Sequence, residues 1–335
     1  MSNTQVLFKS TPEGMPAPAN FEINEAPMPE PGDGEFLLKN LYLSLDPYQR
    51  MLMGGGWTYS PNVLKPGDLM VGRVIGEVIK SNNPDFPVGM HVVGRLGWQT
   101  HVVSDGSNLD FTIEPKDGVP LSAYLGACGS TGTTAWAGLR ITGDPKPGET
   151  VLVSAAAGSV GSTVGQLAKA WGCRAVGIAG GPEKCKLVED DFGFDACVDY
   201  KAPDLAGQIS EAAPDGVDVY FDNVGGAVLE AALANMNRFG RIPVCGVLSA
   251  YNETGEHHGV RNLHLFFDKS LKMEGFVLSA HKDVWPDARA EIEGLIASGK
   301  LAFKETVAEG IENAPDAFIG MLEGRNVGKQ LVKLA

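Results

Sequence analysis

Small residues and a lysine between positions 151 and 184 have the types and spacing that bind phosphate groups. The run Ala156-x-Gly158-Ser159-Val160-Gly161 follows an apolar stretch at 151–153 and precedes apolar residues at helical spacing. A tight turn between a buried strand and a helix presents backbone N–H groups, and the helix N-terminus adds partial positive charge. The pattern therefore predicts a pyrophosphate-binding turn. The alternative is structural, because small residues also pack helices onto sheets where no ligand binds.

The residues after a second strand, at 175–179, indicate which dinucleotide would bind. An NAD site places an acidic side chain there, about 20 residues past the motif, to bind the ribose 2′-hydroxyl. Here the strand ends in Gly180-Gly181-Pro182 without a carboxylate, and Lys184 follows. An ammonium group can pair with a 2′-phosphate, so the sequence predicts NADPH (or NADP) as the cofactor. Glu183 weighs against this prediction, unless it serves in the first turn of the next helix, where the dipole favours an acid.

The elements that must position these residues alternate between strand and helix as far as about residue 278. Strands are expected at 197–200, 217–222, 242–245 and 273–278, and helices at 182–193, 204–213 and 228–236, the last closing near Gly240. With the strands at 151–153 and 175–179, this makes an α/β fold with a Rossmann doubly wound parallel sheet. Gly172 is expected to close the helix after the glycine turn in a left-handed conformation.

Residues 1–125 follow a different pattern of short alternating runs broken by Pro-Gly pairs. This predicts a small, mostly antiparallel β domain. A glycine-rich helix start at 128–139 carries hydroxyl groups and opens the dinucleotide-binding domain, expected over 126–296. The tail at 297–335 breaks the alternation, and we expect it to fold back and complete the first domain.

Composition narrows the class of partner. The chain has 335 residues, with 27 basic and 41 acidic side chains and a net charge of −14, which argues against nucleic acid or an anionic membrane as a partner. No apolar stretch approaches the ~18 residues of a membrane span, and the first residues lack signal-peptide features, so a cytoplasmic protein is expected. The five cysteines are scattered singly. This fits reduced thiols, and no metal site is predicted.

Five segments in order resemble the zinc-independent medium-chain dehydrogenase/reductases, in the branch of leukotriene/prostaglandin, alkenal double-bond and curcumin reductases. The resemblance runs essentially from end to end and implies a GroES-like catalytic domain, built from both ends of the chain, around a central Rossmann domain. It also implies a homodimer formed through the edge strand near Phe276. Where the family's first motif usually has Met, this chain has Gln49, a difference that would alter the pocket wall. The segments are Ser44-Leu45-Asp46-Pro47-Tyr48-Gln49-Arg50, Ala155-Ala156-Ala157-Gly158-Ser159-Val160-Gly161, Phe221-Asp222-Asn223-Val224-Gly225-Gly226, Cys245-Gly246-x-x-Ser249-x-Tyr251-Asn252 and Gly324-Arg325-Asn326-Val327-Gly328-Lys329.

The resemblance also implies roles for individual cofactor-binding residues, position by position. Lys184 and Tyr200 would bind the 2′-phosphate, Thr134 the pyrophosphate side, and Asn223 and Asn326 the ribose–nicotinamide portion. The alternatives are an exposed strand end for Tyr200, a turn residue for Asn223 and a cap for Asn326. Main-chain groups of Phe276 and Val277 would contact the carboxamide. The remaining members of the set are Ala156, Gly158, Ser159, Val160, Gly161, Gly180 and Cys245.

Tyr251 is the candidate catalytic residue. It follows a central strand's carboxyl end, where open α/β sheets bind their ligands. Hydride addition to the β-carbon of an unsaturated aldehyde or ketone moves negative charge onto the carbonyl oxygen. A phenol, with an ordinary pKa of about 10, can donate to that oxygen. A tyrosine packed at a loop edge is the alternative, and the resemblance favours catalysis. Tyr48 and Arg50 are candidates for the substrate pocket, with a structural ion pair as the alternative for Arg50.

The leading hypothesis is an NADPH-dependent reductase of the C=C bond in α,β-unsaturated aldehydes or ketones. A zinc-free NADPH:quinone reductase is the alternative within the same fold. A non-catalytic NADPH-binding protein, of the crystallin-like kind, is the alternative from another class.

Overall fold

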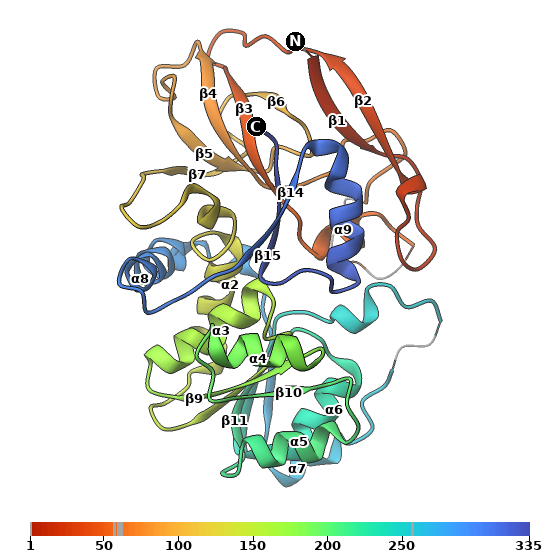
Figure 1. Ribbon diagram of the computed structural model, residues 1–335, viewed down its shortest axis with the longest axis vertical. Helices are drawn as coiled ribbons and strands as arrows, with labels where there is room; N and C mark the ends of the chain where they lie inside the picture. Colours follow the sequence, from red (N-terminus) through yellow and green to blue (C-terminus); the bar gives the residue numbers. More distant parts are fainter. Residues whose placement is uncertain (1, 56–57, 59–62, 256–257) are drawn as a thin grey trace. The chain divides into compact units, whose positions relative to one another are not determined.

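Two compact units make up the chain (Figure 1). The computed structural model describes residues 2–55, 58, 63–255 and 258–335. The first unit combines the chain up to Leu125 with Glu305–Ala335, and the second is Gly126–Lys304. No helix in the described part of the chain is long and apolar enough to cross a membrane.

A seven-stranded, mostly antiparallel sheet forms the centre of the first unit. Its order is β14-β15-β3-β4-β5-β7, with β6 also paired to β3. The C-terminal strand β15 pairs antiparallel with β3 and parallel with β14, so the tail contributes two strands to the sheet that holds β3. The strands are β3 (Phe36–Ser44), β4 (Val74–Ser81), β5 (His91–Gly94), β6 (His101–Ser104), β7 (Leu109–Ile113), β14 (Glu305–Glu309) and β15 (Lys329–Lys333).

An N-terminal hairpin adds an element that the sequence analysis did not predict. β1 (Ser2–Phe8) and β2 (Phe21–Pro27) pair antiparallel along their whole length. Phe21 stacks on Trp98 with ring centroids 5.9 Å apart, and Phe318 meets Trp98 edge-on at 5.6 Å. Phe318 comes from α9 (Ala314–Leu322), so the hairpin and the C-terminal helix share one core with the sheet.

A buried ion pair explains two residues of the first and last family motifs. Lys329 Nζ donates to Asp46 Oδ1 at 2.6 Å and to the Leu45 carbonyl at 2.7 Å. Burial raises the pKa of Asp46, but Lys329 and the Ser44 hydroxyl outweigh it and hold that pKa below its ordinary value. Gln49 is also fully buried; it donates to the Ser44 and Val71 carbonyls and accepts from Asp46 N. Gln49 therefore holds the strand-to-helix connection together, and its effect on a pocket wall stays a prediction.

The second unit contains a six-stranded parallel sheet in the order β10-β9-β8-β11-β12-β13. All five neighbouring pairs are parallel, which confirms the doubly wound Rossmann sheet. The central strand β8 is buried at every residue, as a strand covered on both faces must be. The strands are β8 (Thr150–Ser154), β9 (Arg174–Ala179), β10 (Ala196–Asp199), β11 (Val217–Phe221), β12 (Met236–Val244) and β13 (Lys272–Gly275).

Helices connect these strands. Gly172 follows α3 with φ of +81°, the left-handed conformation that the sequence predicts for the residue closing this helix. Both indole N–H groups of Trp136 and Trp171 donate to the Glu291 carboxylate at 2.7 Å, which joins α2, α3 and α8. The longer helices are α2 (Ser130–Ala137), α3 (Ser159–Ala170), α4 (Pro182–Asp190), α5 (Leu205–Ala212), α6 (Gly226–Asn235) and α8 (Trp285–Ala297). Two short ones, α1 (Tyr48–Leu52) and α7 (His264–Asp268), belong to the first and second units.

Two boundaries differ from the sequence prediction. The helix expected to close near Gly240 ends at Asn235, and Met236 already has extended backbone angles. The segment that follows is a bulge in β12, with Phe239 at φ of +63° and 68% exposed. The second domain also ends at Lys304 rather than at 296. Ala302 exchanges two hydrogen bonds with the Gln166 side chain, which keeps this stretch on the second unit.

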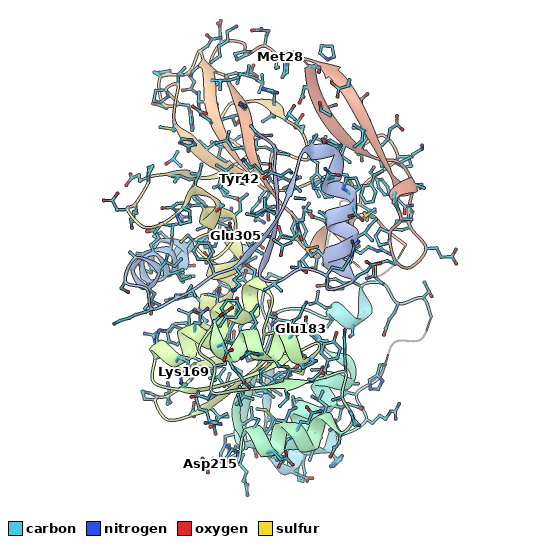
Figure 2. The ribbon with its side chains drawn as sticks, in the orientation of Figure 1. Met28, Tyr42, Lys169, Glu183, Asp215 and Glu305 are labelled. Atoms are coloured by element: carbon cyan, nitrogen blue, oxygen red, sulfur yellow. The ribbon has the colours of Figure 1, made fainter. Side chains whose placement is uncertain are left out.

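The second unit has exposed charged side chains and an open edge strand. Lys169 on α3, Glu183 on α4 and Asp215 are exposed (Figure 2). All four residues of β13 are exposed, and β13 pairs only with β12 among the described residues. Such an edge is available for pairing; the homodimer through it stays a prediction.

Candidate functional site

The predicted glycine turn joins β8 to α3. Ala155 has φ of +52°, which reverses the chain, and a Cβ on Gly161 would lie 2.3 Å from the Ala155 carbonyl oxygen. Glycine is therefore required where the helix starts against the turn. None of the described side chains caps α3, and the N–H groups of Ser159, Val160 and Gly161 lie in its first turn, where helices provide no acceptor. This arrangement suits an anionic ligand.

Ala156 stands where the first glycine of the fingerprint is usual, and the structure explains why alanine fits. Its N–H donates to the Ile178 carbonyl at 3.0 Å, which joins the turn to β9. A Cβ on Gly177 would lie 2.8 Å from the Ala156 methyl group. The side chain thus packs onto a glycine of the neighbouring strand and leaves the helix start open.

Hydroxyl groups from α2 reach this turn, although through a residue that the sequence analysis did not choose. Thr131 Oγ1 lies 2.7 Å from Ser159 Oγ and donates to the Gly126 carbonyl at 2.9 Å. Thr134 instead donates its hydroxyl hydrogen to Ser130 O at 2.7 Å, one helical turn back. Thr131 is part of the same hydroxyl-rich run, but only the packing of α2 on α3 distinguishes it from Thr134.

At the carboxyl ends of β9 and β10, one carboxylate oxygen accepts hydrogen bonds from both of the loops that follow. Asp199 Oδ1 accepts from Gly181 N at 2.7 Å and from Lys201 N at 2.9 Å. Ala179 of β9 and Asp199 of β10 are partners in the sheet, so both loops begin at the same level. A Cβ on Gly180 would lie 2.9 Å from a Tyr200 ring carbon. The ring therefore lies against the Gly180 backbone, with Tyr200 50% exposed.

Two lysines gather beside this pair of loops. Lys184 is half-buried in the first turn of α4, and burial together with the charge of Lys201 lowers its pKa. Lys201 is exposed and was not identified from the sequence. Glu183 is exposed in the same first turn, the position expected for its dipole role. Two cations and an aromatic ring beside glycine backbone are groups that could bind a phosphate, since both lysines can donate hydrogen bonds to it.

The carboxyl ends of β8 and β11 are joined through Asn223 and Asp222. Asn223 Nδ2 donates to the Ser154 carbonyl at 2.7 Å, and its N–H donates to Ser154 Oγ at 2.9 Å. Asp222 Oδ1 accepts from Tyr220 Oη, Val224 N and Gly225 N at 2.8–2.9 Å. Asp222 is fully buried, and this burial raises the pKa of its carboxyl group. Asn223 thus joins two strand ends at the sheet edge where ligands bind, and its cofactor-binding role stays a prediction.

Tyr251 lies at the same edge of the sheet. A Cβ on Gly246 would lie 3.5 Å from the Tyr251 hydroxyl oxygen and 3.2 Å from the Asn223 carbonyl. The phenol is therefore close to the backbone just past β12 and to that of Asn223, rather than directed away at a loop edge. Cys245 N donates to the Asp222 carbonyl at 2.8 Å, and burial raises the pKa of the Cys245 thiol to about 12. A thiol with that pKa stays protonated and unreactive at neutral pH.

Phe276 and Val277 follow β13 at this edge. Phe276 N donates to the Val244 carbonyl at 3.3 Å, and the ring packs edge-on against Phe221 with centroids 6.0 Å apart. A Cβ on Gly138 would lie 2.2 Å from the Phe276 ring, so the ring fills a space that only glycine leaves. Val277 is 51% exposed.

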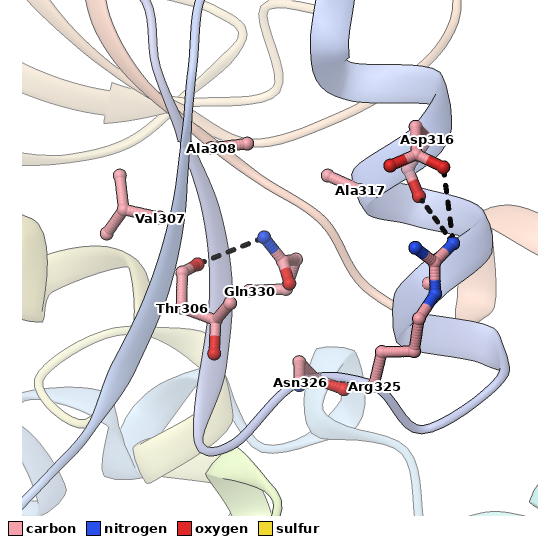
Figure 3. A pocket seen from close by; sticks show the side chains of 9 residues that line it. Thr306, Val307, Ala308, Asp316, Ala317, Arg325, Asn326 and Gln330 are labelled. Carbon is pink, nitrogen blue, oxygen red and sulfur yellow. Dashed lines mark hydrogen bonds and ion pairs between the residues drawn. The ribbon is translucent and has the colours of Figure 1, made fainter.

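Three candidate residues belong to the first unit. Tyr48 lines a pocket of about 410 Å³ whose walls combine apolar side chains with Arg95, Gln99 and Asn108. Arg50 is 2% exposed, and its guanidinium donates to the Gly14 and Gly54 carbonyls. These carbonyls give Arg50 a structural role among the described residues, and its role in the substrate pocket stays a prediction. Asn326 donates to the Gly328 carbonyl at 3.0 Å and lines a second pocket of about 200 Å³ (Figure 3).

Comparisons with known proteins bear on this arrangement. Residues 4–111 match a family model described as the N-terminal domain of oxidoreductase, and residues 159–294 match one described as zinc-binding dehydrogenase. The chain belongs to the zinc-independent branch of the medium-chain dehydrogenase/reductase family. No group of three or more His, Cys, Asp or Glu that could hold a metal ion occurs among the residues that the structure describes.

Relatives in this family resemble the chain along nearly its whole length. The NADPH-dependent curcumin reductase of Escherichia coli is 41% identical, covering 99% of this chain and 97% of its own. The NADP(+)-dependent 2-alkenal reductase of Nicotiana tabacum is 41% identical, with coverages of 100% and 98%. A solved structure of CurA in complex with NADPH, from Vibrio vulnificus, superposes with a TM-score of 0.93 at 40% identity over 99% of both chains.

Proposed function

We propose that this protein reduces the C=C double bond of α,β-unsaturated aldehydes and ketones with NADPH. The observation that carries the proposal is the Tyr251 hydroxyl beside Gly246 and Asn223, at the sheet edge that also holds the glycine turn. A phenol at a dinucleotide-binding edge can donate a hydrogen bond to a substrate oxygen. The family relatives named for curcumin and 2-alkenal reduction support the same chemistry.

NADPH is the cofactor, and the chain's residues fit it. The open N–H groups at the start of α3 suit the pyrophosphate. The loops after β9 and β10 provide Lys184 and Lys201 for the 2′-phosphate, and the Tyr200 ring completes that side. When bound, NADPH supplies the hydride that the β-carbon of the substrate receives.

Tyr251 acts on the other end of the conjugated system. Negative charge develops on the substrate carbonyl oxygen as the β-carbon is reduced, and the Tyr251 hydroxyl donates a hydrogen bond to that oxygen. Asn223 and Asp222 hold the neighbouring strand ends of the same sheet edge in place. The pocket lined by Tyr48 is the proposed substrate site in the first unit, since its volume lies in the usual range of roughly 300–1,000 Å³.

A substrate panel with one NADPH assay tests the reaction. We expect NADPH oxidation with 2-alkenals and enones, and product analysis should show a saturated carbonyl compound with the C=O bond intact. Greater kcat/KM with quinones than with any enal would favour the quinone reductase alternative. An absence of turnover with both classes, despite NADPH binding, would favour a non-catalytic binding protein.

Replacing Lys184 with alanine tests the phosphate site. We expect the preference for NADPH over NADH, measured as a ratio of dissociation constants, to fall about tenfold, because a charge-assisted hydrogen bond is lost. Lys201→Ala should lower the same ratio by less, because that side chain is exposed. Lys186→Ala is the matched control: it removes an exposed charge from the same helix, where Lys186 pairs with Asp190. An unchanged ratio in the Lys184→Ala/Lys201→Ala double variant would place the 2′-phosphate elsewhere.

A further inference from the structure

Two of the five cysteines lie where α4 packs on β9 and β10 (Figure 1). Cys185 and Val188 are the buried residues of α4, so they face the sheet. Cys197 of β10 is the partner of Gly177 in the sheet. A Cβ on Gly177 would lie 3.2 Å from Cys197 Sγ and 2.9 Å from Val188 Cγ1. Because Gly177 has no side chain, the Cys197 thiol reaches the buried face of α4.

Hydrogen bonds hold the two cysteines together. Cys197 N donates to Glu189 Oε1 at 2.7 Å, and Glu189 lies one helical turn beyond Cys185 on the same face of α4. A further hydrogen bond joins the thiols themselves. Burial raises the pKa of both thiols, and this hydrogen bond lowers the pKa of Cys185 and raises that of Cys197. Cys185 is therefore the thiol of the pair that ionises first, and the thiolate is the reactive form.

The pair lies beside the loops that carry the proposed phosphate site. Cys185 directly follows Lys184, and its N–H donates to the Gly181 carbonyl at 3.1 Å. Cys197 lies two residues before Asp199, whose carboxylate accepts from Gly181 N at 2.7 Å. A covalent bond between the two sulfurs would therefore join the first turn of α4 to the end of β10.

We propose that hydrogen peroxide oxidises Cys185 and Cys197 to a disulfide bond, and that this bond weakens NADPH binding. The Cys185 thiolate attacks one peroxide oxygen and the O–O bond breaks, which leaves a sulfenic acid; the released hydroxide takes up the thiol's proton and becomes water. The Cys197 sulfur then attacks the Cys185 sulfur, and the hydroxyl group leaves with the Cys197 proton as a second water. The two sulfurs lose two electrons, and the peroxide gains them.

The disulfide bond changes the position of Lys184. It holds the two sulfurs about 2.05 Å apart, closer than two thiols joined by a hydrogen bond. The first turn of α4 must therefore move toward β10, and Lys184 moves with it. NADPH then loses part of the pairing between its 2′-phosphate and this ammonium group, whereas NADH has no such phosphate. This effect on the coenzyme rests on the proposed phosphate site, but the disulfide itself does not.

Peptide mapping tests the bond. The full-length protein is treated with excess hydrogen peroxide, because buried, protonated thiols react slowly. Remaining thiols are alkylated, and the protein is digested with trypsin without a reductant. Cleavage after lysine places the two cysteines in peptides 185–186 and 187–201. We expect these peptides joined, with the mass of their sum less two hydrogen atoms, and separated again by dithiothreitol.

Three serine variants make the mapping specific. Cys185→Ser and Cys197→Ser should each abolish the joined peptide. Cys173→Ser is the matched control, since it removes another buried thiol of the same unit, which donates to the Lys146 carbonyl, and it should leave the joined peptide unchanged. Unlinked Cys185 and Cys197 after peroxide treatment, whether unmodified or oxidised singly to sulfinic acid, would refute the disulfide.

Coenzyme titration tests the consequence. Oxidation should raise the dissociation constant of NADPH about fivefold, as expected for a weakened charge-assisted hydrogen bond, and leave that of NADH unchanged. Dithiothreitol should reverse the rise, and Lys184→Ala should lack it. A disulfide that forms without changing NADPH affinity would refute the effect on the coenzyme. Turnover of an enal by the reduced protein tests the proposed function separately, since the reduced protein contains no such bond.

Discussion

Tyr251→Phe is expected to lower kcat for an unsaturated aldehyde by about 10²–10³-fold, the usual loss when a preorganised oxyanion donor is removed. Phenylalanine keeps the aromatic ring and removes only the hydroxyl group, the Tyr251 atom that lies nearest Gly246. Because that hydroxyl acts as charge develops on the substrate oxygen, the loss should appear in kcat more than in KM. Binding of NADPH should be unchanged.

Steady-state kinetics with a neutral enal and titration with NADPH measure the two quantities separately. Tyr42→Phe is the matched control, because it removes a phenol from β3, which belongs to the first unit and not to the dinucleotide-binding sheet. We expect it to retain full turnover. If Tyr251→Phe kept more than half of the original kcat, the oxygen would have to receive its hydrogen bond from another donor.

The second large effect is on stability. Lys329→Met should lower the free energy of unfolding by about 3–5 kcal/mol, since it leaves the buried Asp46 carboxylate without its cation. Lys329 and Asp46 are both almost fully buried, and the lysine also donates to Leu45 O. The neighbouring β15 residue Lys333 provides the control: it is partly exposed and 3.9 Å from Glu309, so Lys333→Met should change stability by less than about 0.5 kcal/mol.

Urea denaturation of the unmodified protein, Lys329→Met and Lys333→Met measures these differences in the free energy of unfolding. Combining Lys329→Met with Asp46→Asn should recover part of the loss, because no unpaired charge then stays buried. A loss of less than about 1 kcal/mol in Lys329→Met would mean that the carboxylate gains another partner or takes up a proton at little cost.

The glycine turn and the parallel sheet could be predicted because their signals are local. Apolar runs, glycine spacing and helical periodicity lie within a few residues of one another, and Gly172 shows the expected conformation. Lys201 and Thr131 could not be selected in the same way. Their importance depends on which strand or helix lies beside them, and that is decided by the register of β9 with β10 and by the packing of α2.

Burial explains the other differences. Arg50 and Gln49 have side chains that usually face water, and the sequence offers no sign that backbone carbonyls satisfy them inside the unit. The helical spacing of apolar residues predicts a helix that closes near Gly240. The helix instead ends at Asn235, and Phe239 is exposed in a bulge. Tertiary pairing with β11 determines that outcome, and local preference does not.

The single Asp199 oxygen shared by Gly181 and Lys201 has a consequence for redesigning coenzyme preference. Because both main-chain donors bond to one acceptor, a substitution that displaces either loop also disturbs the hydrogen bond of the other. Converting this enzyme to the unphosphorylated coenzyme by installing an acid at Gly180 would push that new carboxylate against the Tyr200 ring. Both loops would have to be redesigned together, with the Asp199 carboxylate kept as their shared hydrogen-bond acceptor.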